Sequence, residues 1–314
     1  MAGPTKPQAR SRCCRRLRST TAQVKLPEAP LVLAGALGGP FVIFVLTPLR
    51  NALTLASQDI LSSAVELLHM PFADGFSAGW TGGLEPAIMA CPQFCVMGPF
   101  FHFLRETFGS DVLAVCATGM AETVISYSSQ TRNAQMAFNQ MMETMAEVGD
   151  AVSVPLAAPL LPWGPAVSVH IVRNIVALSG IRVFARPIVA VVRRILALLG
   201  ISGLSDLAVG FLADFLASIG SSCISMPLNQ LYNFAVTSKS YLEASGARER
   251  LAVAIGFLDE TYLVRGEDGC FQGISAVVGR DLVLRCLYVA TLFSLFATIE
   301  RGAQFLWKRR KYQE

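Results

Sequence analysis

The sequence predicts an all-α membrane protein with about six transmembrane helices. Hydrophobic residues make up 53% of the 314 residues and charged residues only 15%, whereas a soluble domain carries about 25% charged residues. Several uncharged runs approach the roughly 20 residues that a helix needs to cross a bilayer, and they lack the alternation of barrel strands. This composition excludes a disordered chain and a disulfide-stapled mini-domain, and it predicts no nucleic-acid partner.

Six apolar segments account for the predicted spans, in chain order. The first, second, third and fifth follow runs with few or no charges, and the sixth joins two shorter runs. The fourth begins near residue 164, because prolines at 155, 159, 162 and 165 favour a loop before it. The expected positions are 31–48, 86–104, 112–131, 164 to beyond 182, 215–238 and 274–299.

Charged side chains interrupt these segments. Such residues avoid lipid and face the interior of a helix bundle or a water-filled cavity. We therefore expect a transporter-like bundle with a polar inner face rather than a simple membrane anchor. The residues concerned are Glu122, Arg173, Arg182, Asp214, Arg280, Asp281 and Arg285.

Both ends of the chain are basic. Residues 1–28 contain several arginines and lysines and no acid before Glu28. A mitochondrial presequence has this composition, and so does a tail that contacts anionic lipid or an acidic partner; both interpretations stay open. Residues 304–314 form a second basic tail, directly after an apolar segment, where lipid phosphates are close.

No motif for catalysis or metal binding is present in the sequence. The eight cysteines form no Cys-x-x-Cys pair, and only three histidines occur. Nucleotide-binding glycine loops, Gly-x-Ser-x-Gly and His-Glu-x-x-His are also missing. We therefore predict that the protein is not an enzyme, that it has no metal site and no cofactor, and that the cysteines fill apolar space.

An internal repeat divides the chain into three parts. Pro48 and Pro227 occur in matching contexts, each at the end of a long apolar helix and before a polar stretch, and Ser128 has the same place in the middle. A loop, a glycine and a further helix follow each of these points. The predicted parts are a basic arm (1–28), three repeats (29–110, 111–202 and 203–303) and a basic tail (304–314).

Residues 29–303 resemble the mitochondrial carrier family. The run 34–39 is similar to the glycine-rich packing stripe of the family's first helix, and Pro48 and Pro227 are similar to its helix-kink prolines. Gly273 followed by Arg280 has the spacing seen at the start of the sixth helix. The resemblance implies three tandem helix pairs around a central substrate cavity, a multi-pass location in the mitochondrial inner membrane in preference to the outer one, and contact with cardiolipin or other phospholipids.

The chain departs from the family at the gates. In the family, Pro-x-acid-x-x-base on the odd helices forms ion pairs that close the cavity on the matrix side. Here the acid positions are Arg50, Gln130 and Asn229, and the basic positions are Leu53, Asn133 and Tyr232, so none keeps its charge type. The second gate pattern, aromatic-acid-x-x-base, is also absent from the even helices, for example at 101–105 and 296–300.

The resemblance also indicates where a substrate would make contact, midway along the even helices. The matching positions are Gln93, Arg173, Asn174, Arg280 and Arg285. Buried arginines hold anions through paired hydrogen bonds. The alternative is that these arginines are structural and pair with Asp214, Asp281 or backbone carbonyls.

Two functions remain in competition. The loss of the gate charges favours a degenerate carrier that no longer transports and serves as an accessory subunit of a respiratory-chain complex or of ATP synthase, with lipids and other subunits as partners. The alternative is an atypical transporter of a small anionic metabolite. In that case hydrogen bonds, such as those from Gln130 to Asn133 or Asn229, replace the ionic gate.

Overall fold

The computed structural model describes residues 29–58, 61–145, 153–201 and 203–311. The predicted arm 1–28 and residues 312–314 of the predicted tail lie outside these ranges. The described chain is mostly helical, and five of its helices are long and apolar enough to cross a membrane. A sixth span results when the bent pair Ala29–Val45 and Thr47–Ala56 is taken as one segment. The expectation of a helical membrane protein is confirmed at this level.

Six helical segments make up the bundle, and three further α-helices and two strands lie between them. The segments are α1 (Ala29–Leu33) to α3 (Thr47–Ala56) through a π-helical turn and α2 (Gly39–Val45); α5 (Leu84–Cys95) with α6 (Phe101–Phe108); α7 (Asp111–Met145); α8 (Val167–Ser179) with α9 (Ala185–Leu198); α10 (Asp206–Thr237); and α13 (Val277–Lys311). The connecting elements are α4 (Ala64–His69), α11 (Lys239–Glu243), α12 (Ala247–Tyr262) and the strands β1 (Leu263–Arg265) and β2 (Phe271–Ile274).

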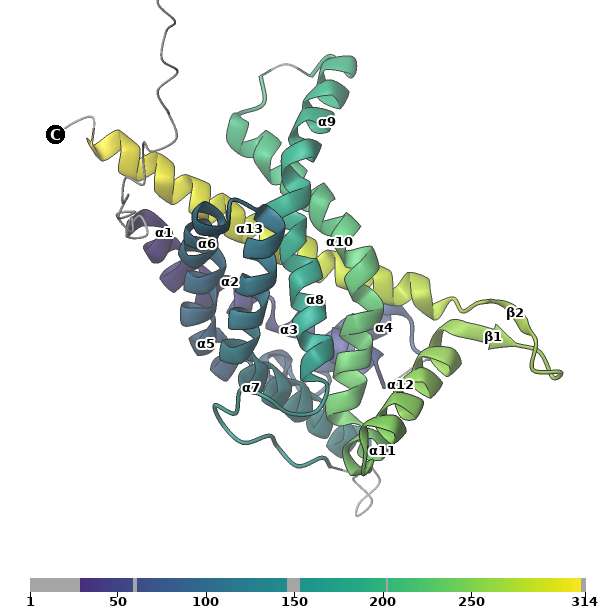
Figure 1. Cartoon of the computed structure of the whole chain (residues 1–314). Helices are drawn as coiled ribbons and strands as arrows, with labels where there is room; N and C mark the ends of the chain where they lie inside the picture. The colour runs from purple at the N-terminus through teal and green to yellow at the C-terminus, as the bar shows by residue number, and fades with distance from the viewer. Residues whose placement is uncertain (1–28, 59–60, 146–152, 202, 312–314) are drawn as a thin grey trace, which may run out of the picture.

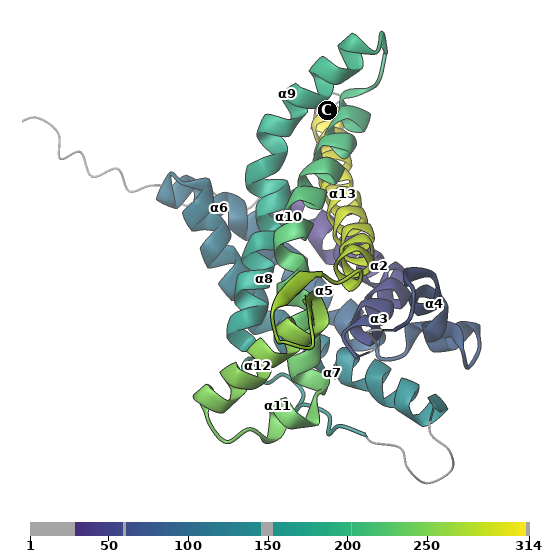
Figure 2. The same ribbon diagram turned by 90° about the vertical axis from the view of Figure 1, so that its right-hand side faces the viewer.

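The six segments pack in chain order into a closed ring (Figure 1). Each segment contacts the next, and α13 contacts the first segment along α1, α2 and α3, which closes the ring. The ends of the bundle differ: α9 and the C-terminal end of α13 lie at one, and α11 and α12 at the other (Figure 2). We call these the α9 end and the α12 end.

The distribution of apolar and polar side chains is that of a protein surrounded by lipid. Each segment exposes large apolar side chains on its outer surface; one from each is Phe41, Ile88, Val124, Val172, Ile224 and Leu287. Polar side chains are buried inside the ring, and six of the seven charged residues expected to face the interior are buried: Glu122, Arg173, Arg182, Asp214, Asp281 and Arg285. The side chain of the seventh, Arg280, is 7% exposed. Apolar outside and polar inside is the arrangement of a bundle in a membrane.

The first segment bends by 54° between its two parts. Pro48 lies at the start of α3 and has no N–H to give to the carbonyl of Phe44, four residues earlier. The indole Nε1 of Trp80 donates to that carbonyl instead, at 2.9 Å. Pro227, by contrast, lies inside α10, which continues as one helix from Asp206 to Thr237.

The small sheet is a departure from the predicted all-α fold. β1 and β2 pair antiparallel just before the sixth segment, where we expected a helix from residue 274; α13 begins only at Val277. The residues that form the strands include Val264, Phe271 and Ile274, which favour extended backbone. Gly269 supplies the positive φ (+74°) that the turn needs. A run of apolar residues this short does not distinguish a strand from a helix.

Candidate functional site

A cavity of about 60 Å³ lies inside the ring, and side chains from all six segments line it. All six gate positions predicted from the sequence are among the lining residues: Arg50, Leu53, Gln130, Asn133, Asn229 and Tyr232. Four of the five predicted contact positions join them: Gln93, Arg173, Asn174 and Arg285. The closed ring therefore gathers into one site residues that are far apart in the sequence.

Arg173 on α8 is held by neutral groups. Its guanidinium donates to Oε1 of Gln130 at 2.8 Å and to Oδ1 of Asn174 at 3.0 Å, and more weakly to Oδ1 of Asn229 at 3.3 Å. It also lies over the ring of Tyr232, with 4.6 Å to the ring centre. Amide oxygens and an aromatic face orient a guanidinium, but none of them carries a formal negative charge.

Arg285 on α13 has the same kind of environment. It donates to Oδ1 of Asn229 at 2.9 Å and to Oγ of Ser225 at 3.3 Å. The oxygen of Asn229 thus accepts from two guanidinium groups, those of Arg285 and Arg173. The sequence pattern predicts an acid at position 229, and Asn229 is a neutral amide.

Arg50 on α3 is the third arginine of the cavity. Its Nε and Nη2 atoms are buried and have no hydrogen-bond partner among the residues that the structure describes. A buried donor without a partner is costly, and a buried charged donor more so. The sequence pattern predicts an acid at this position, and Arg50 has the opposite charge.

The single carboxylate of the lining, Glu122, forms no ion pair with the cavity arginines. Its oxygens accept from Nε2 of Gln93 at 2.6 Å, from Oγ of Ser126 at 3.1 Å, and from Nδ2 of Asn174. Asn174 therefore stands between Glu122 and Arg173, giving its N–H to one and its oxygen to the other. Among the charged residues that line the cavity, three are arginines and one is a carboxylate.

Hydrogen bonds between uncharged groups bridge the odd segments (the first, third and fifth) on the α12 side of the bundle. Nδ2 of Asn133 donates to Oδ1 of Asn51 at 3.2 Å and joins α7 to α3. The hydroxyls of Thr131 and Tyr232 are 2.7 Å apart and join α7 to α10. Nδ2 of Asn233 donates to the carbonyl of Leu53 at 3.2 Å and joins α10 to α3.

These bridges use partners that the sequence did not indicate. Gln130 was expected to bond Asn133 or Asn229, but its oxygen accepts from Arg173. Asn133 bonds Asn51 instead. Neutral bonds between the odd segments are nevertheless present, as the transporter hypothesis requires.

A buried ion pair bridges the even segments toward the α9 end. Arg182 donates to both oxygens of Glu300 on α13, at 2.9 and 3.0 Å, and to the carbonyl of Met97 at 2.8 Å. Gly98 is next to this contact, and a Cβ atom there would come within 2.6 Å of Oε1 of Glu300. The sequence indicated that Arg182 faces inward but not its partner, because Glu300 follows the last apolar run.

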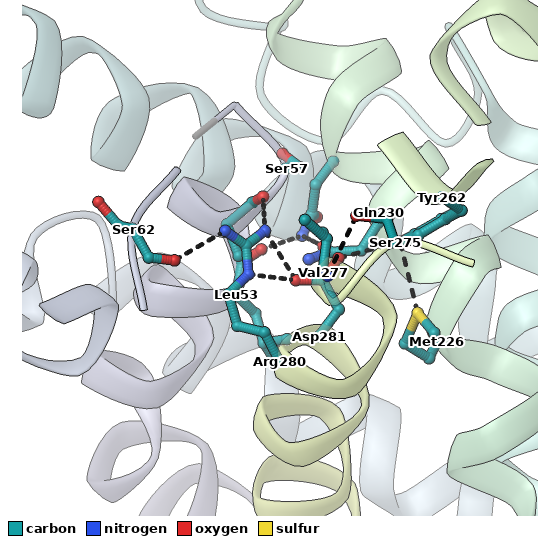
Figure 3. A network of polar contacts seen from close by, with 12 residues as sticks. Leu53, Ser57, Ser62, Met226, Gln230, Tyr262, Ser275, Val277, Arg280 and Asp281 are labelled. Atoms are coloured by element: carbon teal, nitrogen blue, oxygen red, sulfur yellow. Dashed lines mark hydrogen bonds and ion pairs between the residues drawn. The ribbon is translucent and has the colours of Figure 1, made fainter. Parts of the chain in front are cut away.

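Arg280 is the predicted contact residue that does not line the cavity. Figure 3 shows the polar contacts around it. Its guanidinium pairs with Asp281 at 2.9 Å and donates to the carbonyls of Ala56 and Ser62, at 2.9 and 3.0 Å. The hydroxyl of Tyr262 donates to the second oxygen of Asp281 at 3.0 Å. The contacts of Arg280 therefore fit the alternative in which the predicted arginines are structural. Arg280 holds the start of α13 to the end of α3.

Asp214, the other expected carboxylate partner, pairs with Arg301 rather than with a cavity arginine. Neither Arg173 nor Arg285 forms an ion pair among the described residues. Comparison of the chain with protein-family models, curated proteins and solved structures finds no match. The function has therefore to be inferred from the cavity and from the two bridged regions on either side of it.

Proposed function

We propose that the protein is a membrane transporter that binds a small anion in the central cavity. The observation that carries this proposal is the charge of the lining, where Arg50, Arg173 and Arg285 face one carboxylate that is already held by neutral donors. A charge removed from water needs a counter-charge. An anionic ligand supplies it, and guanidinium groups bind oxyanions through paired hydrogen bonds.

The two bridged regions support transport rather than static binding. A transporter opens its site to one side and then to the other, so each side needs contacts that form in one state and break in the other. The neutral bonds between the odd segments serve on the α12 side, and the Arg182–Glu300 pair serves on the α9 side. Neutral hydrogen bonds cost little to break, since each contributes about 0.5–1.5 kcal/mol net.

We further infer that the fold is that of a mitochondrial carrier with altered gates. Six segments that close a ring in chain order, with a polar cavity at the centre, support this assignment. The inner mitochondrial membrane is the location that goes with it, and cardiolipin is the expected lipid partner.

The accessory-subunit role stays a prediction. This prediction rests on the absence of the six gate charges. Without them, the ends of the bundle were expected to be unable to open and close. The described odd segments are bridged without those charges, through Asn133, Thr131 and Asn233. The absence of the gate charges is therefore no longer an argument that the protein has lost transport. Native gel electrophoresis in mild detergent tests this role, because a subunit would migrate with a large assembly.

The transport proposal is tested with the full chain reconstituted into vesicles. Arg173→Gln and Arg285→Gln should each reduce uptake of small anions by about tenfold or more, because each removes a charge-assisted contact worth about 1.5–3 kcal/mol. Arg194→Gln is the matched control, because Arg194 is exposed on α9 and should leave uptake unchanged. The same anions should raise the unfolding temperature of the wild type, since a ligand that binds only the folded state stabilises it.

Failure of the wild type to bind or take up any small inorganic or organic anion would overturn the proposal. So would full activity of both Arg173→Gln and Arg285→Gln. Co-migration with a large complex, together with no uptake, would favour the accessory role.

A further inference from the structure

The cavity has room for a small anion. A buried water molecule needs about 10–15 Å³ of cavity volume, so about 60 Å³ accommodates several waters. A tetrahedral oxyanion, one central atom with four oxygens, fits this space.

The charge of the lining points to a dianion. Three arginines and Glu122 leave a net charge of two positive units in the lining. A dianion balances this charge, whereas a monoanion leaves a buried positive charge without a partner. Phosphate in its hydrogen phosphate form and sulfate both meet this requirement.

Glu122 distinguishes these two ions. Its carboxylate has about four acceptor sites, and three of them are taken by Gln93, Ser126 and Asn174. The remaining site can accept the P–OH hydrogen of phosphate. Sulfate has no hydrogen at neutral pH, so its oxygens would face the carboxylate as one acceptor against another.

We propose that the anion bound in this cavity is hydrogen phosphate, held by the three arginines and selected over sulfate by Glu122. This inference rests on the proposed function and gives it a substrate. The guanidinium groups of Arg173 and Arg285 converge on the oxygen of Asn229, and a phosphate oxygen binds to them beside it.

Binding of labelled phosphate and labelled sulfate to the purified full chain tests the proposal. The wild type should prefer phosphate by about tenfold or more, the effect of one unsatisfied buried group. Glu122→Gln places an N–H donor in the lining, so the preference should fall to about one or reverse. Glu260→Gln is the control, because Glu260 is exposed on α12 and its loss should leave the preference unchanged.

A second variant keeps the test informative if Glu122→Gln does not fold. Asn229→Asp adds a carboxylate between Arg173 and Arg285 and lowers the net charge of the lining to one positive unit. It should weaken binding of both anions, and of sulfate at least as strongly as of phosphate, because sulfate has no hydrogen to donate to an added acceptor. A preference shifted toward sulfate in Asn229→Asp would contradict selection by a carboxylate and with it the role given to Glu122.

The outcomes separate this inference from the proposed function. Equal binding of the two oxyanions by the wild type would overturn the selection by Glu122, and so would an unchanged preference in Glu122→Gln. Binding of succinate with no binding of either oxyanion would overturn the phosphate assignment and leave anion transport intact. No binding of any anion would overturn both.

A phosphate group also occurs in lipid headgroups, and a final arm separates the two sources. The full chain in phosphatidylcholine nanodiscs should bind free phosphate, and adding phosphatidic acid to the nanodiscs should leave that binding unchanged. Displacement of free phosphate by phosphatidic acid would assign the cavity to a lipid headgroup and overturn the proposal for a free ion.

Discussion

Arg50 is the residue whose surroundings most strongly indicate a missing partner. Within the described part of the chain, its Nε and Nη2 atoms are buried without acceptors, so the unliganded protein carries their desolvation cost. Replacing Arg50 with methionine keeps an unbranched side chain and removes the charge. We expect Arg50→Met to raise the free energy of unfolding of the unliganded protein by about 1–3 kcal/mol. It should also weaken anion binding.

Thermal unfolding in detergent, with and without phosphate, measures both effects. The unliganded variant should unfold at a higher temperature than the wild type, and phosphate should raise that temperature less. Arg194→Met, on the exposed surface of α9, should change neither value. An unliganded Arg50→Met that is less stable than the wild type would show that Arg50 has a structural role.

The sequence was informative about which residues face inward and uninformative about their partners. Charged residues inside apolar runs were expected to be buried, and those singled out are. The contact of Arg173 with Gln130, from α8 to α7, depends on how two helices are rotated against each other. One residue of rotation turns a side chain by about 100° on a helix with 3.6 residues per turn. Apolar runs do not define helix rotation that closely.

At the scale of elements, the region toward the α9 end is built from irregular helix. Met97 lies in the π-helical segment Val96–Phe100, and Arg182 in the π-helical segment Gly180–Phe184. Such segments change the direction of side chains along a helix and are frequent at functional sites. Here they bring a guanidinium and a backbone carbonyl together with Glu300 of α13.

We expect Glu300→Gln to destabilise the protein by about 3–5 kcal/mol, because it leaves the buried guanidinium of Arg182 without a counter-charge. The double variant Arg182→Met with Glu300→Gln should recover much of this loss, because no buried charge then remains unpaired. Urea unfolding of the four proteins in a double-mutant cycle gives the coupling energy. Additive effects in this cycle would contradict a bridge between the π-helical segment Gly180–Phe184 and α13.

How well the boundaries of an element could be predicted from the sequence depended on the residues at its ends. The first segment was expected at 31–48, and the bend at Pro48 follows from a missing N–H that the sequence makes visible. The hairpin of β1 and β2 was missed, because Phe271–Ile274 is too short a run to distinguish strand from helix. Glu300 was not linked to Arg182, because 118 residues separate them and only the closed ring brings them together.

At the scale of the whole molecule, the ring is completed by contacts between the last segment and the first. Arg280 and Asp281 lie at the start of α13, and the carbonyls of Ala56 and Ser62 lie at and just beyond the end of α3 (Figure 3). Arg285 is only five residues further along the same helix, yet it lines the cavity. Two arginines with similar positions in the sequence therefore have different roles.

This difference can be measured by comparing Arg280→Gln with Arg285→Gln. Arg280→Gln leaves the buried carboxylate of Asp281 without its cation, so it should lower the free energy of unfolding by about 3–5 kcal/mol. Its anion affinity should stay within about twofold of the wild type, because the cavity lies elsewhere. Arg285→Gln should show the reverse pattern, with little loss of stability and an anion affinity lower by about tenfold or more. Chemical unfolding and phosphate binding, measured on the same preparations, decide between them. Loss of anion binding in Arg280→Gln at temperatures where it is folded would show that closure of the ring and the binding site are one unit.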